Sequence, residues 1–284
     1  MELTEITAQS LRLGALSKSA DAHKYAHGHA LVLTGGPGKT GAARLAARGA
    51  LRIGAGLVTL GCPRSALYEI ATHSTAIMCR PLDGAPGLTE ALEDARLNVL
   101  CLGPGLGLGP DTQAMVLAAL KAKRATVLDA DALSRFERNA DVLFAALHPG
   151  CILTPHTGEF RRLFPDLAEM LQAGTQVDAV CAAAARAGCT VLLKGPETIV
   201  ADPARQAVII KSTGEAAAPW LATAGSGDVL AGFITGLMAR GMQPLEAAGT
   251  GAWLHAACAR HFGPGLIAED LPEQLPAVFR DLRV

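Results

Sequence analysis

Short apolar runs alternate with alanine-rich stretches along most of the chain. The runs are continuous rather than alternating with polar residues, which is the pattern of strands buried on both faces. They lie at residues 30–34, 57–60, 98–102, 125–128, 151–154 and 190–193. The stretches between them read as helices. Alternation of this kind predicts an α/β fold, with a mostly parallel central sheet covered by helices on both faces.

Other segments complete this prediction. Residues 198–201 and 207–211 flank Asp202-Pro203 and predict a hairpin. The small and apolar residues 229–238 predict a buried helix, and residues 265–282 predict one or two closing helices. The segment before residue 30 is polar and leads into the first predicted strand. Because the chain has no linker-like stretch and no repeat of fixed period, we expect a single domain over residues 1–284.

One predicted helix carries an unusual charge pattern. Residues 41–54 contain Arg44, Arg48 and Arg52 at a spacing of four, which places the three guanidinium groups on one helix face.

Almost every polar or glycine-rich cluster directly follows a predicted strand. These clusters are Gly35-Gly36, Gly103 to Gly107, Asp129 to Asp131, His156 to Glu159 and Lys194 to Thr198. Ligands of open parallel sheets bind outside the carboxyl ends of the strands, so we expect the clusters to share one rim. No cluster identifies the ligand alone: the Walker motif is absent, and the glycines after the first strand do not have Rossmann spacing.

The stretch Gly225-Ser226-Gly227-Asp228 opens the predicted helix 229–238 and joins this rim. Little side chain covers its backbone, so the amides of Gly225, Ser226 and Gly227 are a candidate anion hole at a helix N-terminus. A carboxylate directly beside such a site suits the deprotonation of a hydroxyl next to a phosphate. The alternative is that Asp228 only caps the helix.

Composition excludes several classes of protein. The chain has 284 residues, 25 basic and 26 acidic, so its net charge of −1 gives no electrostatic footprint for nucleic acid. No apolar run is long enough to span a bilayer, and the N-terminus lacks the pattern of a signal peptide. Seven cysteines without a C-x-x-C pair favour reduced thiols and a cytoplasmic location.

Several motifs together resemble one known family. They include residues 34–63, the octapeptide LTPHTGEF at 153–160 and the segment ATAGSGDVLAGF from Ala222 onward. The chain resembles the ribokinase-like superfamily and, within it, the ADP/ATP-dependent NAD(P)H-hydrate dehydratases, from about residue 23 to about residue 262. Two departures are visible. The family's GGTGD is AGSGD here, with Ala224 and Ser226, and the N-x-x-E run of related sugar kinases is replaced by residues 156–159.

The resemblance implies an activity and a set of site residues. Family members use a nucleotide to dehydrate hydrated NADH and NADPH, through phosphorylation of the C6 hydroxyl and elimination of phosphate. Asp228 would be the catalytic base. The positions matching dinucleotide contacts are Ala42, Gly105, His156 and Asp228. Those matching the adenine-nucleotide site are Lys194, Gly195, Pro196, Glu197, Thr198 and Gly227. The implied cofactors are ADP or ATP and Mg²⁺, which Glu159 would help to organise through water.

The residues alone leave plainer interpretations open. His156 could be a hydrogen-bonded core histidine, and Lys194 a solvated strand end. His23, His27 and His29 are interpreted as a polar surface loop rather than a metal site. Asp129 and Asp131 could be a metal pair, or a turn with a helix cap.

Three functions remain for the whole chain. The first is the dehydratase, acting on small molecules, as a homo-oligomer, alongside a separate NAD(P)H-hydrate epimerase. The alternative is a hydroxymethyl or hydroxyethyl kinase of the same superfamily, which LTPHTGEF disfavours. The third is a non-catalytic nucleotide sensor, which the intact Asp228 disfavours.

Overall fold

The computed structural model describes residues 2–172 and 174–284, and it arranges ten strands in one sheet. The strands are β1 (Glu2–Glu5), β2 (His29–Leu33), β3 (Leu57–Cys62), β4 (Met78–Pro81), β5 (Leu97–Leu102), β6 (Ala125–Leu128), β7 (Cys151–Leu153), β8 (Thr190–Leu193), β9 (Glu197–Ala201) and β10 (Gln206–Lys211). Their order is β1-β10-β9-β8-β7-β6-β5-β2-β3-β4, and of these ten only β9 is antiparallel to both neighbours. The mostly parallel α/β sheet and the β9–β10 hairpin are therefore confirmed.

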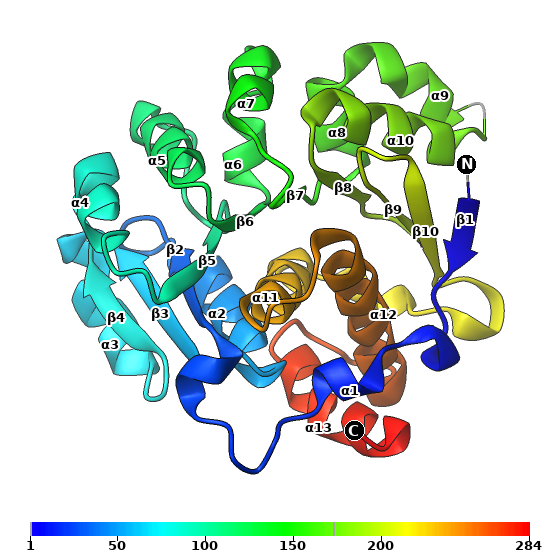
Figure 1. Cartoon of the computed structure of the whole chain (residues 1–284), viewed down its shortest axis with the longest axis horizontal. Helices are drawn as coiled ribbons and strands as arrows, with labels where there is room; N and C mark the ends of the chain where they lie inside the picture. The colour runs from blue at the N-terminus through cyan, green and yellow to red at the C-terminus, as the bar shows by residue number, and fades with distance from the viewer. Residues whose placement is uncertain (1, 173) are drawn as a thin grey trace.

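The α-helices connect these strands and cover both faces of the sheet (Figure 1). They are α1 (Leu13–Leu16), α2 (Gly41–Arg52), α3 (Leu67–His73), α4 (Gly84–Ala91), α5 (Pro110–Lys121), α6 (Asp131–Ser134), α7 (Ala140–Ala146), α8 (Thr157–Leu163), α9 (Ala168–Gln172), α10 (Gln176–Ala187), α11 (Ser226–Ala239), α12 (Pro244–Phe262) and α13 (Asp270–Leu282). Among the described residues, no helix has the length and apolar character needed to cross a membrane.

Each central strand is buried on both faces, because successive side chains point to opposite sides. On β2, Ala30 and Val32 pack in the core beneath α2, α11, α12 and α13, whereas Leu31 and Leu33 pack in the core beneath α4, α5 and α10. Figure 1 shows α11 and α12 on one side of the sheet and α5 and α7 on the other. The continuous apolar runs in the sequence follow from this double burial.

The sequence prediction missed two strands, and both are edge strands. β1 has the sequence ELTE and pairs with β10, and β4 has the sequence MCRP and pairs with β3. An edge strand needs only one row of hydrogen bonds and tolerates charge and proline, so it lacks the apolar run that marks a central strand. The polar lead before residue 30 is therefore partly sheet.

The chain reverses its direction of travel across the sheet between β2 and β5. It runs from β2 to β3 and β4 on one side, and then returns to place β5 on the other side of β2. The crevice above such a switch point is the usual ligand site of an open parallel sheet.

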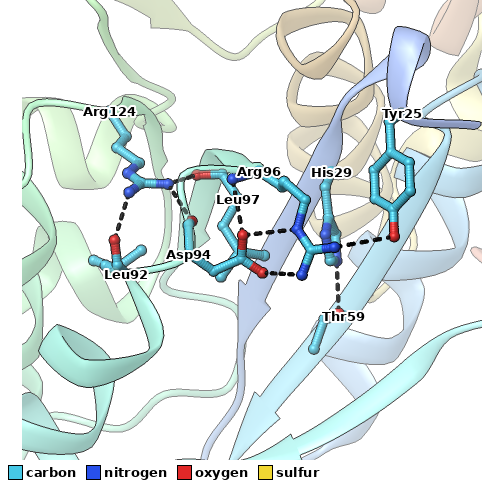
Figure 2. A network of polar contacts seen from close by, with 8 residues as sticks. All are labelled: Tyr25, His29, Thr59, Leu92, Asp94, Arg96, Leu97 and Arg124. Carbon is cyan, nitrogen blue, oxygen red and sulfur yellow. Dashed lines mark hydrogen bonds and ion pairs between the residues drawn. The ribbon is translucent and has the colours of Figure 1, made fainter.

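The opposite end of β2 is closed by a polar network (Figure 2). Arg96 donates to Asp94 and to the Tyr25 hydroxyl, and Arg124 donates to the carbonyl oxygens of Leu92, Asp94 and Leu97. His29 is buried there and shares a 2.8 Å hydrogen bond with the Thr59 hydroxyl. The surface-loop interpretation is therefore wrong for His29, which lies on β2, while His23 is exposed in the preceding loop.

Candidate active site

Direct contacts join the clusters that follow the strands into one rim. A Cβ atom built on Gly35 would lie 2.1 Å from the carbonyl oxygen of Gly105, and one on Gly103 would lie 1.7 Å from that of Asp129. Gly107 donates its amide to Asp131 Oδ2 at 2.7 Å. Further along, His156 and Lys194 form an isolated parallel bridge. The predicted common rim is present, and it runs from the end of β2 to the end of β8.

A buried ion pair lies near the middle of this rim. Lys194 Nζ donates to Asp129 Oδ1 at 2.6 Å, and the Thr154 hydroxyl donates to the same oxygen at 2.8 Å. The exposed fractions of the two charged side chains are only 19% and 2%. Burial lowers the pKa of Lys194, but Asp129 and Glu159 raise it more, so the ammonium stays charged. Lys194 is therefore not a solvated strand end, and Asp129 is tied to Lys194 rather than paired with Asp131.

Asp228 lies in the first turn of α11 with its carboxylate free of hydrogen bonds to any described residue. The helix begins at Ser226 with Gly225 at its N-cap, and no side chain caps it. Burial, Asp129 and Asp131 raise the pKa of Asp228 to about 6, although Lys194 opposes them. The capping interpretation of Asp228 is thus wrong. A carboxylate with a pKa near neutrality can accept a proton and release it again, which is the requirement for a general base.

Only part of the predicted anion hole has free amides. The amide of Ser226 donates weakly to the Thr223 carbonyl oxygen at 3.4 Å, and its hydroxyl donates to Leu221 at 2.8 Å. In contrast, the amides of Gly225, Gly227 and Asp228 make no hydrogen bond to another described residue. The free donors at the N-terminus of α11 therefore include the predicted Gly225 and Gly227, with Asp228 in place of Ser226.

His156 and Glu159 bind each other at the start of α8. His156 Nδ1 accepts from the amides of Gly158 and Glu159, and Glu159 Oε2 accepts from the amide of His156 at 2.9 Å. The His156 side chain is 53% exposed, so the core-histidine interpretation is wrong. Glu159 is buried and burial raises its pKa, which Lys194 only partly offsets. The described residues include no group of three or more His, Cys, Asp or Glu side chains arranged to hold a metal ion.

Five of the predicted nucleotide residues line one cavity of about 470 Å³. They are Lys194, Gly195, Pro196, Thr198 and Gly227. Glu197 does not line it and is exposed at the start of β9. The remaining walls come from the end of β10, from the turn that includes Pro219 and Leu221, and from α12. The wall is mainly apolar with polar groups at one end, as expected for a site that takes a purine and its phosphates.

His255 on α12 also lines this cavity, and the sequence reasoning missed it. Its Nε2 atom lies 2.8 Å from the carbonyl oxygen of Ser226, which can only accept, so Nε2 carries the proton. Burial lowers the pKa of His255 to about 4, which keeps the ring neutral. Through this hydrogen bond, His255 holds the backbone of the loop 225–227 in place. It stands among alanines in the sequence, and no spacing connects it to the loop 29 residues earlier.

The predicted dinucleotide residues Ala42 and Gly105 are neighbours, although neither lines the cavity above. A Cβ atom on Gly105 would lie 3.6 Å from Ala42 Cβ and 2.4 Å from the Lys39 carbonyl oxygen. Together they bring the start of α2 against the turn after β5, at the switch point of the sheet. His156 lies farther along the rim, beside Lys194.

The backbone geometry at Gly105 predicts that any substitution there destabilises the fold, and this effect must be separated from weaker ligand binding. Gly105 has φ +67°, and Gly107 in the same turn has φ +87° with nothing within 4 Å of a built Cβ atom. We expect Gly107→Ala to lower the free energy of unfolding by about 1–2 kcal/mol, through backbone strain alone. Gly105→Ala should cost about 1–3 kcal/mol more, because the methyl group also displaces Lys39. Urea denaturation of both variants measures the difference, and equal losses would contradict the predicted contact.

Comparisons with known proteins show what this chain is similar to. Residues 30–276 match the family model described as NAD(P)H-hydrate dehydratase. The chain is 39% identical over 291 residues to a bifunctional NAD(P)H-hydrate repair enzyme of Moorella thermoacetica, covering 98% of this chain and 54% of that protein. It is 37% identical to an ADP-dependent (S)-NAD(P)H-hydrate dehydratase of Neisseria meningitidis serogroup B, covering 86% of this chain and 80% of that one. The chain thus spans about half the length of the first of these relatives.

The fold comparison agrees. The structure of the ADP/ATP-dependent NAD(P)H-hydrate dehydratase of Bacillus subtilis, co-crystallised with ATP/Mg²⁺, superposes with a TM-score of 0.80 at 29% identity, covering 99% of both chains. The chain also superposes on a ribokinase-like superfamily protein of Enterococcus faecalis with a TM-score of 0.82 at 20% identity, covering 99% of this chain and 96% of that one, so the two share a fold.

Proposed function

Because this chain belongs to the NAD(P)H-hydrate dehydratase family, we propose that it uses ADP or ATP to convert hydrated NADH and NADPH back to the intact cofactors. The observation that carries the proposal is the position of Asp228. Its carboxylate is free, has a pKa raised to about 6, and follows the amides that open α11 beside the nucleotide cavity. A proton acceptor beside an anion site is what phosphorylation of a hydroxyl requires.

The reaction then has two steps. The C6 hydroxyl of the hydrated ring attacks the terminal phosphorus of the nucleotide, the O–H proton moves to Asp228, and the shorter nucleotide leaves. In the second step the C6–O bond breaks and phosphate departs with the bonding pair, pushed out by the ring nitrogen. Loss of a proton from C5 forms the C5–C6 double bond and restores the cofactor. Phosphate is a far better leaving group than hydroxide, which explains the need for a nucleotide.

We assign one set of residues to the adenine nucleotide and another set to the hydrated dinucleotide. Lys194, Gly195, Pro196, Thr198 and Gly227 hold the adenine nucleotide, since all five line the same cavity. Ala42, Gly105 and His156 contact the hydrated dinucleotide, and the proximity of Ala42 to Gly105 supports this. The free amides at the start of α11 stabilise negative charge on the transferring phosphoryl group.

We also propose that Mg²⁺ accompanies the nucleotide, as in the co-crystals of the Bacillus subtilis protein. Mg²⁺ needs few protein ligands when it bridges phosphates, so the lack of a three-residue cluster among the described residues is compatible with it. Glu159 would act through water, because one of its oxygens already accepts from His156. The ion would neutralise phosphate charge during transfer.

Three further proposals concern the setting of the reaction. A separate epimerase would supply the reactive form of the hydrate, since the Moorella thermoacetica relative is named as bifunctional. The enzyme would act as a homo-oligomer in the cytoplasm. The structure describes all seven cysteines and places none of them in a disulfide, which supports a reducing compartment.

The decisive experiment incubates the protein with hydrated NADH, Mg²⁺ and either ADP or ATP. We expect the absorbance of intact NADH to return in step with the release of inorganic phosphate. A stable phosphorylated product without NADH would instead identify a small-molecule kinase. Nucleotide binding without any turnover would identify a sensor, and either result would overturn the proposal.

A further inference from the structure

A second cavity, of about 630 Å³, lies along α2. Its wall includes Gly41 and Leu45 from α2, the segment 73–77 that begins at the last residue of α3, and Glu269. A Cβ atom on Gly225 would lie 2.6 Å from Leu45 Cδ1, so this wall touches the loop that carries Asp228. The two cavities share no lining residue: Ser226 and Gly227 line the first, whereas the second reaches this loop only through Leu45.

The three arginines at four-residue spacing line this cavity, but only one of them makes no hydrogen bond or ion pair with a described residue. Arg48 and Arg52 both donate to Glu273, at 2.9 Å and 2.6 Å. Arg44 makes no hydrogen bond or ion pair with any described residue. Glu69, a carboxylate that Arg44 acts on electrostatically, already accepts from the Gly38 amide and the Thr40 hydroxyl. Arg44 is therefore a half-buried guanidinium with its donors free.

Further free donors face the same space. The hydroxyl groups of Ser74 and Thr75 and the imidazole of His73 line the cavity, and none has a hydrogen-bond partner among the described residues. A guanidinium with two hydroxyl donors is a set suited to a phosphate monoester, whose three oxygens accept from several directions. Neither Arg48 nor Arg52 competes for this role, because Glu273 holds both.

We propose that this cavity binds the adenosine half of the dinucleotide and that Arg44 binds its ribose 2′-phosphate, so that the protein prefers hydrated NADPH to hydrated NADH. The inference rests on the proposed function, which places the reacting ring at Asp228 and the dinucleotide against Ala42. The cavity begins at Gly41, one residue away, and continues along α2. The helix rise places Arg44 about 5 Å beyond Gly41, on the path that leads away from the reacting ring. The cavity proposed for the adenine nucleotide has a different set of lining residues, so the nucleotide does not compete for this space.

The test compares the two hydrates in Arg44→Gln, with Arg138→Gln as a matched control. Arg138 is an exposed arginine that makes no hydrogen bond to a described residue and does not line either cavity. We expect Arg44→Gln to lower kcat/KM for hydrated NADPH by about tenfold or more, the usual worth of a charge-assisted hydrogen bond. Turnover of hydrated NADH should stay within about twofold, and Arg138→Gln should change neither. Arg44→Lys, which keeps the charge, should recover part of the loss.

A second readout keeps the inference independent of catalysis. Calorimetric titration with NADPH and NADH should show that Arg44→Gln weakens only NADPH binding. If the parent protein turns over neither hydrate, the proposed function fails while this titration still tests the cavity. Equal losses for both dinucleotides would overturn the role of the 2′-phosphate, and no loss for either would overturn the cavity assignment. A shift to a smaller assembly in sedimentation, on Arg44→Gln, would show that a second copy covers the cavity instead.

Discussion

Lys194→Met should lower the free energy of unfolding by about 3–5 kcal/mol at pH 8, the usual cost of removing one partner from a buried ion pair. Methionine nearly conserves the volume of lysine but removes the charge. Asp129 would then be left buried with only the Thr154 hydroxyl, and Glu159 would lose the ammonium that offsets its burial. Urea denaturation measures the loss. It should be smaller at pH 5, because an unpaired buried carboxylate can take up a proton.

Lys211→Met is the matched control for this prediction. Lys211 Nζ lies 2.8 Å from Glu5 Oε2, but both side chains are nearly half exposed. A solvated pair of this kind contributes about 0–1 kcal/mol. Similar losses in the two variants would contradict the structural role of Lys194.

The double variant Lys194→Met, Asp129→Asn separates folding from ligand binding. It removes the orphaned carboxylate and should recover much of the lost stability. Calorimetric titration of ADP with this variant then measures what the ammonium contributes to the nucleotide. Affinity equal to that of the parent would show that Lys194 serves the fold and not the phosphates.

Much of the fold could be predicted from the sequence, because a strand that is buried on both faces of the sheet appears in the sequence as a continuous apolar run. Six parallel strands and a hairpin appear as apolar runs, since each side chain of such a strand meets a helix layer. The two edge strands, β1 and β4, have no such apolar run: Leu3, Thr4 and Glu5 on β1 are exposed, and residues 79–81 on β4 are only half-buried. The order of the strands in the sheet also cannot be predicted from short sequence patterns, because the placement of β5 beside β2 depends on how the whole sheet packs.

The site could be predicted as a set of positions but not as a set of interactions. Glycines and charged residues after strands indicated the rim correctly, and the resemblance indicated which of them to group. The pairing of Lys194 with Asp129 joins residues 65 positions apart, and the support of Ser226 by His255 crosses 29. Contacts of this kind depend on the sheet order, so residue type and spacing do not reveal them. The uncommitted Arg44 also became distinct from Arg48 and Arg52 only when Glu273 was located.

Asp228→Asn should lower the rate of dehydration by roughly 10²–10⁴, the usual contribution of a positioned general base. Asn has nearly the same shape, and the carboxylate makes no hydrogen bond to a described residue that Asn would break. Nucleotide affinity should therefore persist. Asp270→Asn is the control: Asp270 also lies in the first turn of a helix, where Oδ2 accepts from the Ile267 amide, and its replacement should leave turnover unchanged.

The pH dependence of the parent and the variant separates loss of a base from damage to the fold. The pKa of Asp228 is raised to about 6, so kcat/KM of the parent should fall about tenfold per pH unit below pH 6, as the base becomes protonated. The same raised pKa means that the fold favours the protonated carboxyl. Parent stability should therefore rise relative to the Asn variant as pH falls from 6 to 4, and at pH 8 the variant should be the more stable by about 3 kcal/mol. Turnover within a few-fold of the parent at pH 8 would refute the assignment of Asp228 as the base. If the variant were less stable than the parent at pH 8, the ionised carboxylate of Asp228 would stabilise the fold, which would contradict its raised pKa.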